Sequence, residues 1–283
     1  MANIRAIRHR IRSIKNIAKI TRAMEMIAAS KMRRAQERGL AGRPYSEKIQ
    51  QVIADLAALP DMALHPLLQR RPVAKIAIVH ITPDRGLCGG LNASINRLTA
   101  GFILEKSAPV TLITVGRKGR DFMRRYGSDV CAEFIQLGDQ PSLMDTLPIS
   151  HIIIDDYSSG AVDLVYLVYA KFVSTLVQKP VMQQLLPVEP AVIPAAQNVD
   201  YIYEPGPEAV LGALLPRFVE MQVYHTILEA IASEQSARMV AMRNATDNAN
   251  ELIGDLTLVY NKARQEAITK ELLDIAGGAA ALT

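Results

Sequence analysis

Tryptophan is absent from this chain of 283 residues, aromatic residues make up only 5% of it, and there are only two cysteines. Hydrophobic residues nonetheless reach 49% and are mostly Ala, Ile, Leu, Val and Met, which favours helix seams over a thick aromatic core. Cys88 and Cys131 lie far from any Cys or His cluster, and the five histidines lack HxxxH or HExxH spacing. We therefore expect reduced thiols and no metal site, and no apolar run approaches the ~18 residues that a membrane span needs.

Acidic residues are missing from the first 24 positions, which are Arg-rich and amphipathic. A mitochondrial transit peptide has the same composition, but the helical pattern continues through Glu25, Met26 and Lys31, so we expect this segment to belong to the mature protein. Residues 1–40 carry eleven Lys and Arg against two acidic residues, Glu25 and Glu37, for a net charge of +9. Such a block favours an anionic partner, which can be nucleic acid, an anionic membrane or an acidic protein surface.

The N-terminal end of the chain is predicted to be a long helix, because residues 3–38 contain neither Pro nor Gly. A bend is predicted where Gly39, Gly42 and Pro44 interrupt the pattern, and a helix is expected to resume to about residue 59. The apolar seam is expected to shift by one residue, as in a stammer, between two groups of positions: Ile4, Ile7, Ile11 and Ile14, then Ile17, Ile20, Met24 and Ile27.

The C-terminal end has a seam with alternating steps of four and three, which is the heptad spacing of a coiled coil. Its positions are Leu214, Phe218, Met221, His225, Leu228, Ala232, Gln235, Met239, Met242, Thr246, Ala249, Ile253, Leu256, Tyr260 and Ala263. A helix is predicted from Pro207, with a kink or short break over Gly212–Pro216. The two ends are expected to pair as an antiparallel coiled coil, and the residues from Ala263 onward then need a wall supplied by a partner.

The middle of the chain, residues 70–206, has a different pattern. Short apolar runs predict strands at 73–81, 110–115, 130–135, 151–154 and 180–188, and helices are predicted between them at 91–105, 117–126 and 161–177. Strands that are apolar on both faces and alternate with helices indicate a mostly parallel sheet. The predicted fold class is therefore α/β: a long antiparallel coiled coil of residues 1–59 and 207–283, plus a Rossmann-like α/β domain at 70–206.

Two motifs suggest chemistry. The glycine-rich loop 84–92 (DRGLCGGLN) follows a strand and opens a helix, where phosphates often bind, but it lacks GK[ST] and a GxGxxG frame. Asp155 and Asp156 resemble a carboxylate pair at a strand end, without a His or Lys beside them. We expect no catalytic residue, cofactor or metal. A nucleotide-binding enzyme that uses this loop and a basic coiled-coil adaptor for nucleic acid remain as alternatives.

Several segments resemble the gamma subunits of F-type rotary ATP synthases of the bacterial kind. The N-terminal helix resembles theirs at 11–16 (IRSIKN), 19–26 (KITRAMEM) and 28–36 (AASKMRRAQ), and the loop 84–92 is similar to that family's glycine loop. The C-terminal helix resembles theirs at 232–235 (ASEQ), 237–239 (ARM), 244–249 (NATDNA), 258–265 (LVYNKARQ) and 268–272 (ITKEL). The dithiol insertion of chloroplast gamma subunits is absent.

This resemblance implies a non-catalytic central rotary stalk that couples ion-driven rotation of a c-ring to ATP synthesis or hydrolysis at beta subunits. The implied partners are the alpha and beta subunits of a hexameric ring, the epsilon subunit and the c-ring, with no nucleic acid and only a peripheral association with the cytoplasmic face of the plasma membrane. The implied ring contacts are Met24, Lys31, Arg33, Arg34, Arg264 and Gln265. The implied contacts of the α/β domain with epsilon or the c-ring are Tyr201, Tyr203 and Glu204.

Overall fold

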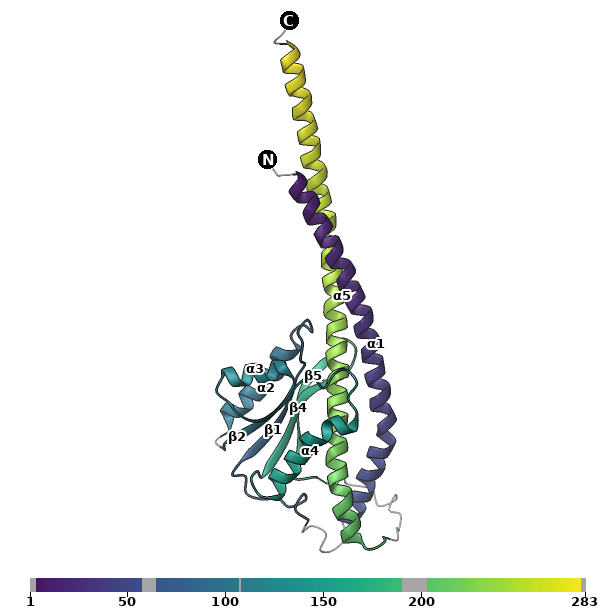
Figure 1. Ribbon diagram of the computed structural model, residues 1–283, viewed down its shortest axis with the longest axis vertical. Helices are drawn as coiled ribbons and strands as arrows, with labels where there is room; N and C mark the ends of the chain where they lie inside the picture. The colour runs from purple at the N-terminus through teal and green to yellow at the C-terminus, as the bar shows by residue number, and fades with distance from the viewer. Residues whose placement is uncertain (1–3, 58–64, 107, 190–202, 281–283) are drawn as a thin grey trace. The chain divides into compact units, whose positions relative to one another are not determined.

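The computed structural model describes residues 4–57, 65–106, 108–189 and 203–280 (Figure 1). It divides into two compact units. The two-helix unit consists of Met1–Ala28 and Met239–Thr283, and the α/β unit consists of Ala29–Arg238. Helix α1 (Ile4–Ala57) and helix α5 (Pro207–Ala280) each contribute to both units.

The α/β unit contains a five-stranded sheet with the order β3-β2-β1-β4-β5. Its strands are β1 (Ile76–Ile81), β2 (Val110–Val115), β3 (Asp129–Phe134), β4 (Leu164–Phe172) and β5 (Gln178–Leu186). The first four are parallel and β5 is antiparallel to β4. All six residues of β1 are buried, which agrees with its central place and with the continuous apolar run of its sequence. The predicted α/β class with a mostly parallel sheet is confirmed.

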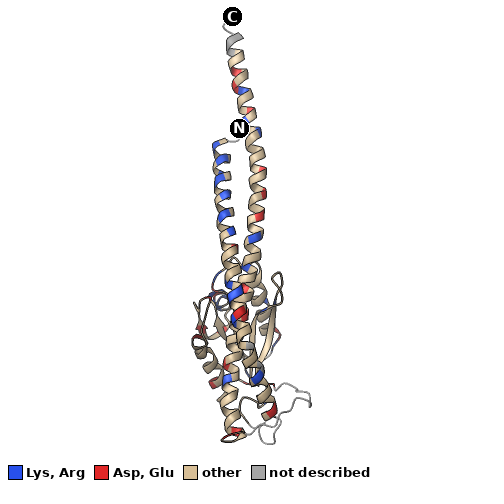
Figure 2. Cartoon of the chain, turned by 90° about the vertical axis from the view of Figure 1, so that its right-hand side faces the viewer, with Lys and Arg blue, Asp and Glu red and all other residues tan. Residues whose placement is uncertain are grey.

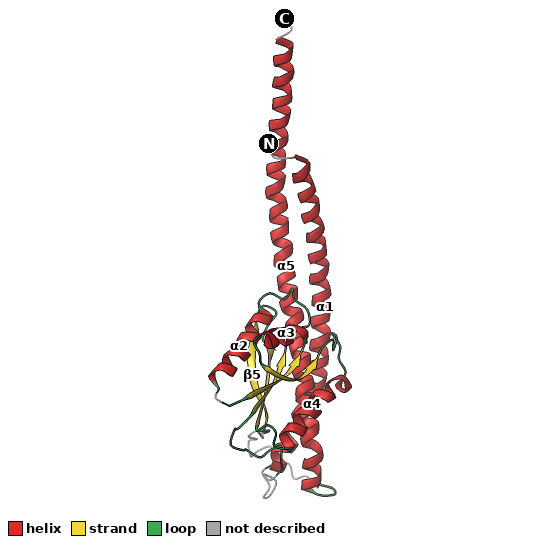
Figure 3. Ribbon diagram, turned by 60° about the vertical axis from the view of Figure 1, so that its left-hand side comes forward, coloured by secondary structure: helices red, strands yellow, loops and turns green. Residues whose placement is uncertain are grey.

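Helices cover both faces of this sheet (Figures 1 and 3). On one face, α2 (Leu91–Glu105) and α3 (Arg117–Arg125) pack through Ile95 and Met123 against the β1 residues Ile76 and Ile78. On the other face, α4 (Leu143–Ser158), α1 and α5 pack around the β1 residues Ala77, Val79 and Ile81. Alternate residues of one strand therefore enter two separate cores, as the two-residue period of a strand requires.

The order of elements after β3 corrects two predictions. Residues 151–154 are not a strand, because they belong to α4, and residues 161–177 are not a helix, because they contain β4. A capping box between Ser142 and Asp145 begins α4, and Ile149 and Ile153 lie one turn apart on its buried face. Asp155 and Asp156 consequently lie in the last turn of a helix and not at a strand end.

Neither terminal helix is interrupted at its proline, so the interruption of the helix at residues 39–44 and the short break over Gly212–Pro216 are wrong, whereas a bend or kink at these positions stays a prediction. Pro44 lies inside α1 and Pro216 lies inside α5. Proline within a helix costs about 3 kcal/mol locally. Leu211, Leu215 and Val219 are nevertheless fully buried on both sides of Pro216, and this packing outweighs the missing backbone hydrogen bond.

The seam of the two-helix unit also differs from the prediction on α1. Ile17, Ile20 and Ile27 are exposed, and no shift of register occurs. The buried positions instead continue the heptad begun by Ile11 and Ile14, through Ala18, Thr21, Glu25 and Ala28. On α5 the predicted seam is confirmed here, because Met239, Met242, Thr246 and Ala249 are all buried. The seam of α1 thus buries small or polar residues such as Ala18 and Thr21, although the larger apolar residues Ile17 and Ile20 precede them directly in the sequence.

Candidate functional site: the exposed surfaces of the paired helices

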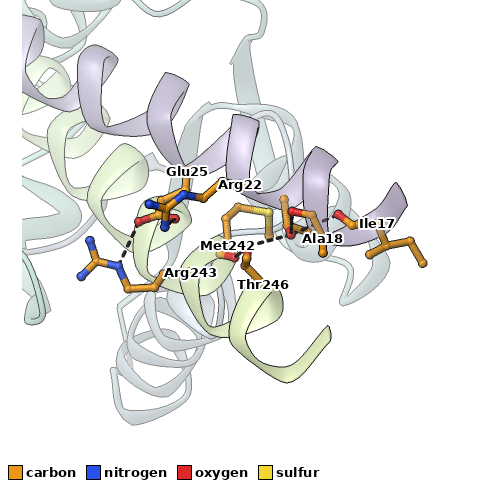
Figure 4. Close-up of polar contacts among 8 residues, drawn as sticks. Ile17, Ala18, Arg22, Glu25, Met242, Arg243 and Thr246 are labelled. Carbon is orange, nitrogen blue, oxygen red and sulfur yellow. Dashed lines mark hydrogen bonds and ion pairs between the residues drawn. The ribbon is translucent and has the colours of Figure 1, made fainter. Parts of the chain in front are cut away.

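A polar layer joins the two helices of the two-helix unit (Figure 4). The hydroxyl oxygens of Thr21 and Thr246 are 2.7 Å apart and buried. Each hydroxyl also contacts a carbonyl of its own helix, since Thr21 Oγ1 is 3.1 Å from the oxygen of Ala18 and Thr246 Oγ1 is 2.9 Å from that of Met242. Buried polar pairs in a coiled coil penalise any other register, because sliding would leave both hydroxyls without their partner.

One turn away, the Glu25 carboxylate lies between arginines of both helices (Figure 4). Its side chain is 8% exposed and accepts hydrogen bonds from Arg22 of α1 at 3.1 Å and from Arg243 of α5 at 2.9 Å. Nearer the N-terminus, Arg8 donates to the Tyr260 hydroxyl at 2.7 Å, which lowers the pKa of that phenol. The pairs 8 with 260, 21 with 246 and 25 with 243 run in opposite directions along the two helices, so the coiled coil is antiparallel, as predicted.

The exposed side of α1 is strongly basic, and Lys and Arg recur along it turn after turn (Figure 2). A groove of about 810 Å³ opens between the helices of the two-helix unit. Its basic lining residues are Arg12, Lys15, Lys19 and Arg22, all from α1, whereas α5 contributes Asp247 and Asn250. This surface presents four cations and one carboxylate, so it is electrostatically suited to an acidic partner.

The far end of α5 has an exposed surface of mixed character. Leu258, Leu272, Leu273 and Ile275 are exposed apolar side chains there, at 62–70% exposure. Arg264 and Gln265 are exposed on the same stretch. Several large apolar side chains exposed on one stretch of helix indicate a surface that a protein partner covers. The prediction that the residues from Ala263 onward need an outside wall thus agrees with their exposure.

The four residues of α1 that were predicted to contact the ring differ in their exposure and in their partners. Met24 is half-buried in the two-helix unit. In the α/β unit, Lys31 is half-buried and forms an ion pair with Asp139 at 2.6 Å. Arg33 and Arg34 are exposed, and both contact residues of their own helix, Arg33 through Glu37 at 3.0 Å and Arg34 through the Ser30 hydroxyl at 3.1 Å. Arg33, in an exposed ion pair with Glu37, and Arg34 therefore lie at the surface, whereas Lys31 is paired with a residue from another part of the chain.

The predicted contacts for epsilon or the c-ring are only partly described. Tyr203 is half-buried and packs against the buried core of the α/β unit, and Glu204 is exposed. Tyr201 lies outside the described residues. The structure thus places one of these three side chains at the surface and one against the core.

The glycine-rich loop opens on a small cavity at the carboxyl ends of β1, β2 and β3. The cavity measures about 50 Å³ and is closed by Ile227, Ile231 and Glu234 of α5. Ligand sites for small molecules typically measure 300–1,000 Å³, so this space does not accommodate a nucleotide. Two of the loop's hydrogen-bond acceptors are also engaged within the chain. Asp84 accepts from the backbone N–H groups of Arg117 and Gln136, both at 2.9 Å, and the Gly86 carbonyl accepts from Arg238 at 3.2 Å.

Arg238 and Glu234 of α5 form an ion pair beside this loop, and the sequence analysis did not predict a contact between either residue and the loop. They are joined at 2.6 Å and both are largely buried. Burial raises the pKa of the Glu234 carboxyl, and the neighbouring guanidinium opposes that rise. Across residues 4–57, 65–106, 108–189 and 203–280, no group of three His, Cys, Asp or Glu is arranged to hold a metal ion. Over the same ranges, no helix has the length and apolarity required for crossing a bilayer.

Solved structures with a similar fold define the class of protein. The chain matches a subunit in the structure of the Tetrahymena thermophila mitochondrial ATP synthase central stalk and c-ring, with a TM-score of 0.63 and 28% identity over 80% of this chain and 99% of that one. A subunit of the Euglena gracilis mitochondrial ATP synthase, in a structure of its OSCP, F1 and c-ring, matches with a TM-score of 0.67 and 20% identity over 99% of this chain and 94% of that one. The fold is that of ATP synthase stalk subunits.

The sequence comparisons identify the family. A family model described as ATP synthase matches residues 3–282. The ATP synthase gamma chain of Dehalococcoides mccartyi is 70% identical over the full length of both chains, and that of Chloroflexus aurantiacus is 53% identical, also over both full lengths. The chain belongs to the ATP synthase gamma chain family. It is a subunit of ATP synthase with a central stalk role, which confirms the resemblance.

Proposed function

We propose that this chain is a non-catalytic rotary shaft, which couples rotation of an ion-driven c-ring to ATP synthesis or hydrolysis at the beta subunits. The observation that carries the proposal is the contrast between the two faces of the paired helices. Polar contacts such as Thr21–Thr246 fix the seam, while the outer faces are basic on α1 and partly apolar on the far end of α5. Such an element keeps its own register while a surrounding ring contacts it.

The shaft acts by making different contacts with each subunit around it. A rotor shifts the conformational equilibrium of a surrounding subunit only by the difference in contact free energy between the two conformations. Both helices expose apolar side chains, such as Ile20 on α1 and Leu272 on α5, but the excess of cations lies on α1, so the two helices offer surfaces of different charge. Each beta subunit therefore meets a different surface at each rotary position, and its preferred conformation changes in turn.

The non-catalytic role is supported by the glycine-rich loop. Its carboxylate Asp84 and its carbonyl at Gly86 are both used within the chain, and the adjoining cavity holds only about 50 Å³. We expect the purified chain to bind no nucleotide. Its reconstitution with alpha and beta subunits tests the function directly: an active ATPase that depends on this chain supports the proposal, and an alpha–beta assembly that excludes it overturns the proposal.

Arg33 and Arg34 are the exposed cations best placed to meet acidic surfaces of beta subunits. Each exposed ion pair contributes only about 0–1 kcal/mol and is screened by salt, so the pair acts on coupling more than on folding. Changing both to Glu should reduce ATP-driven proton pumping while the thermal unfolding temperature stays near that of the wild type. Unchanged pumping by the double variant would remove the electrostatic role.

Arg264 and Gln265 are proposed to hold a loop of one beta subunit. Both side chains are exposed, and adjacent helix positions point about 100° apart, so together they cover a broad patch. Loss of a hydrogen bond to a charged group costs roughly 1.5–3 kcal/mol in the rotary state that makes it. Replacing both with Ala should therefore slow ATP synthesis and hydrolysis without preventing assembly. Asp255→Ala, at an exposed position of the same helix, is the matched control; equal rates for both variants would contradict the assignment.

The remaining assignments concern the α/β domain, which we propose at residues 70–206 between helical ends at 1–59 and 207–283. Tyr201, Tyr203 and Glu204 are proposed to face epsilon or the c-ring. We also propose a peripheral location on the cytoplasmic face of a bacterial plasma membrane, reached through the c-ring. Ala substitutions at the three positions should weaken attachment of the assembled catalytic portion to c-ring-containing membranes, measured as the fraction released on washing.

A further inference from the structure

The loop between β3 and α4 contacts both long helices of the α/β unit. Gln136 and Gly138 have positive φ angles of 61° and 78°, so the chain turns sharply as it leaves β3. The backbone N–H of Gln136 donates to Asp84 at 2.9 Å, which ties the start of the loop to the glycine-rich loop that follows β1. The capping box of Ser142 and Asp145 holds its other end on α4. The segment between these two anchors, residues 137–141, is therefore a short tethered strap.

Asp139 is the residue of this strap that joins the helices. Its Oδ2 accepts from Lys31 Nζ of α1 at 2.6 Å, and its Oδ1 accepts from Gln235 Nε2 of α5 at 3.0 Å. Each carboxylate oxygen thus serves one helix. Gln235 is only 2% exposed, so its amide has little access to water and depends on a protein acceptor.

Two flanking contacts follow the same arrangement. Arg38 of α1 donates to the side-chain oxygen of Gln140 at 2.7 Å, and the Tyr224 hydroxyl of α5 lies 3.5 Å from the Pro141 carbonyl. Three consecutive strap residues therefore contact the paired helices. This recurrence distinguishes the strap from a single surface ion pair, which by itself contributes little.

We infer that Asp139 is a positioning residue that clamps α1 and α5 to the sheet, so that both helices turn together with the α/β domain. The inference rests on the proposed rotary function. Lys31 then serves the clamp and does not contact a beta subunit, contrary to the role that the family resemblance implies. Without the clamp, the helices stay packed on the sheet through their apolar core but lose their polar contacts with the strap, so that part of the hydrolysis proceeds without turning the c-ring.

Variants of Asp139 separate its two contacts. Asp139→Asn keeps an acceptor for Gln235 and removes the charge that pairs with Lys31, whereas Asp139→Ala removes both. The readout is the number of protons pumped per ATP hydrolysed by the complete, membrane-reconstituted ATP synthase. We expect Asp139→Ala to raise the population of released molecules relative to clamped ones by up to about fivefold, the factor that corresponds to a partly exposed ion pair, and so to lower the number of protons pumped per ATP; Asp139→Asn should lower this number less. Glu189→Gln removes the exposed ion pair with Arg70 in the same unit and should leave the ratio unchanged.

A charge exchange decides between the clamp and a direct beta contact of Lys31. Lys31→Glu alone should uncouple, and Lys31→Glu with Asp139→Lys should restore most of the ratio, because the Gln235 amide can turn to offer its oxygen to the new lysine. A double variant that is as uncoupled as Lys31→Glu alone would overturn the clamp. So would an Asp139→Ala complex with the ratio of Glu189→Gln. Wild-type complexes that fail to pump at all would instead overturn the rotary function itself.

Discussion

Gly42 lies inside α1 with the ring of His225 from α5 against it, and this contact allows a stability prediction in the α/β unit. A Cβ added at Gly42 would overlap Cε1 of His225 and lie 2.8 Å from Nε2. Glycine inside a helix costs about 0.8–1.0 kcal/mol relative to alanine. Gly42 therefore makes α1 less stable than alanine would, but it leaves room for the His225 ring. Gly39 lies in the same helix, and a Cβ there would meet nothing within 4 Å.

The two glycines should therefore respond to alanine with opposite signs. Gly39→Ala should raise the free energy of unfolding by up to about 1 kcal/mol, because it gains helix propensity without a clash. Gly42→Ala gains the same amount but crowds a half-buried ring, and overpacking costs about 1–3 kcal/mol. The expected net effect of Gly42→Ala is a loss of roughly 1 kcal/mol.

A double-mutant cycle isolates the contact. In a His225→Ala background the clash is gone, so Gly42→Ala should become stabilising by about 1 kcal/mol, which gives a coupling energy near 2 kcal/mol. The assay is urea unfolding of the purified chain, followed by far-UV circular dichroism at one pH. If Gly42→Ala is stabilising in the wild-type background, or if its effect is the same with and without His225, the ring does not account for the glycine.

Three further predictions concern buried polar groups. Burial lowers the pKa of His80 to about 4, so the folded chain keeps this side chain neutral at pH values where the unfolded chain, with a pKa near 6.5, binds a proton. As the pH is lowered between those two values, the free energy of unfolding should therefore fall by about 1.4 kcal/mol per pH unit. His80→Gln should remove this contribution when urea unfolding is measured as a function of pH. Arg243→Met leaves the buried Glu25 carboxylate with Arg22 alone and should destabilise by roughly 1 kcal/mol, since the arginine itself is half-exposed; a thermal scan that shows no loss would contradict the role of this pair. Thr246→Val should cost about 1 kcal/mol by the same measurement, and the Thr21→Val, Thr246→Val double variant should cost less than the sum of the single changes, because the two hydroxyls serve each other.

Much of the framework follows from local pattern. The predicted limits of α2 and β2 agree with the observed Leu91–Glu105 and Val110–Val115, because each segment is bounded by glycine, proline or polar residues and has one clear period. The α5 seam is predictable for the same reason, since its heptads recur over many turns. The family motifs are equally local, and they identify the chain without any knowledge of its packing.

The order of α4 and β4 was decided by tertiary packing. A short apolar run such as residues 151–154 fits a buried strand and a buried helix turn equally well. The segment 164–172 becomes a central strand because β1 lies on one side of it and β5 on the other. These neighbours are distant in sequence, and no local period reports them.

Packing also decided which residues of α1 form the seam and how its charges are used. Helix propensity does not decide which of Ile17 and Ala18 faces inward, because both are in the helix either way, and hydrophobicity alone favours burying the isoleucine. The structure buries Ala18, Thr21 and Glu25, because their partners on α5 are Thr246 and Arg243, which need short or polar neighbours. In the same way, no sequence pattern distinguishes the charge of Lys31 from the ten other cations of residues 1–40, and only the fold shows that it pairs with Asp139. The sequence alone determined that the chain has two long terminal helices that pair with each other and an α/β domain between them in sequence. Only the tertiary structure decided which face of α1 enters the seam, because that choice depends on the atoms opposite each position.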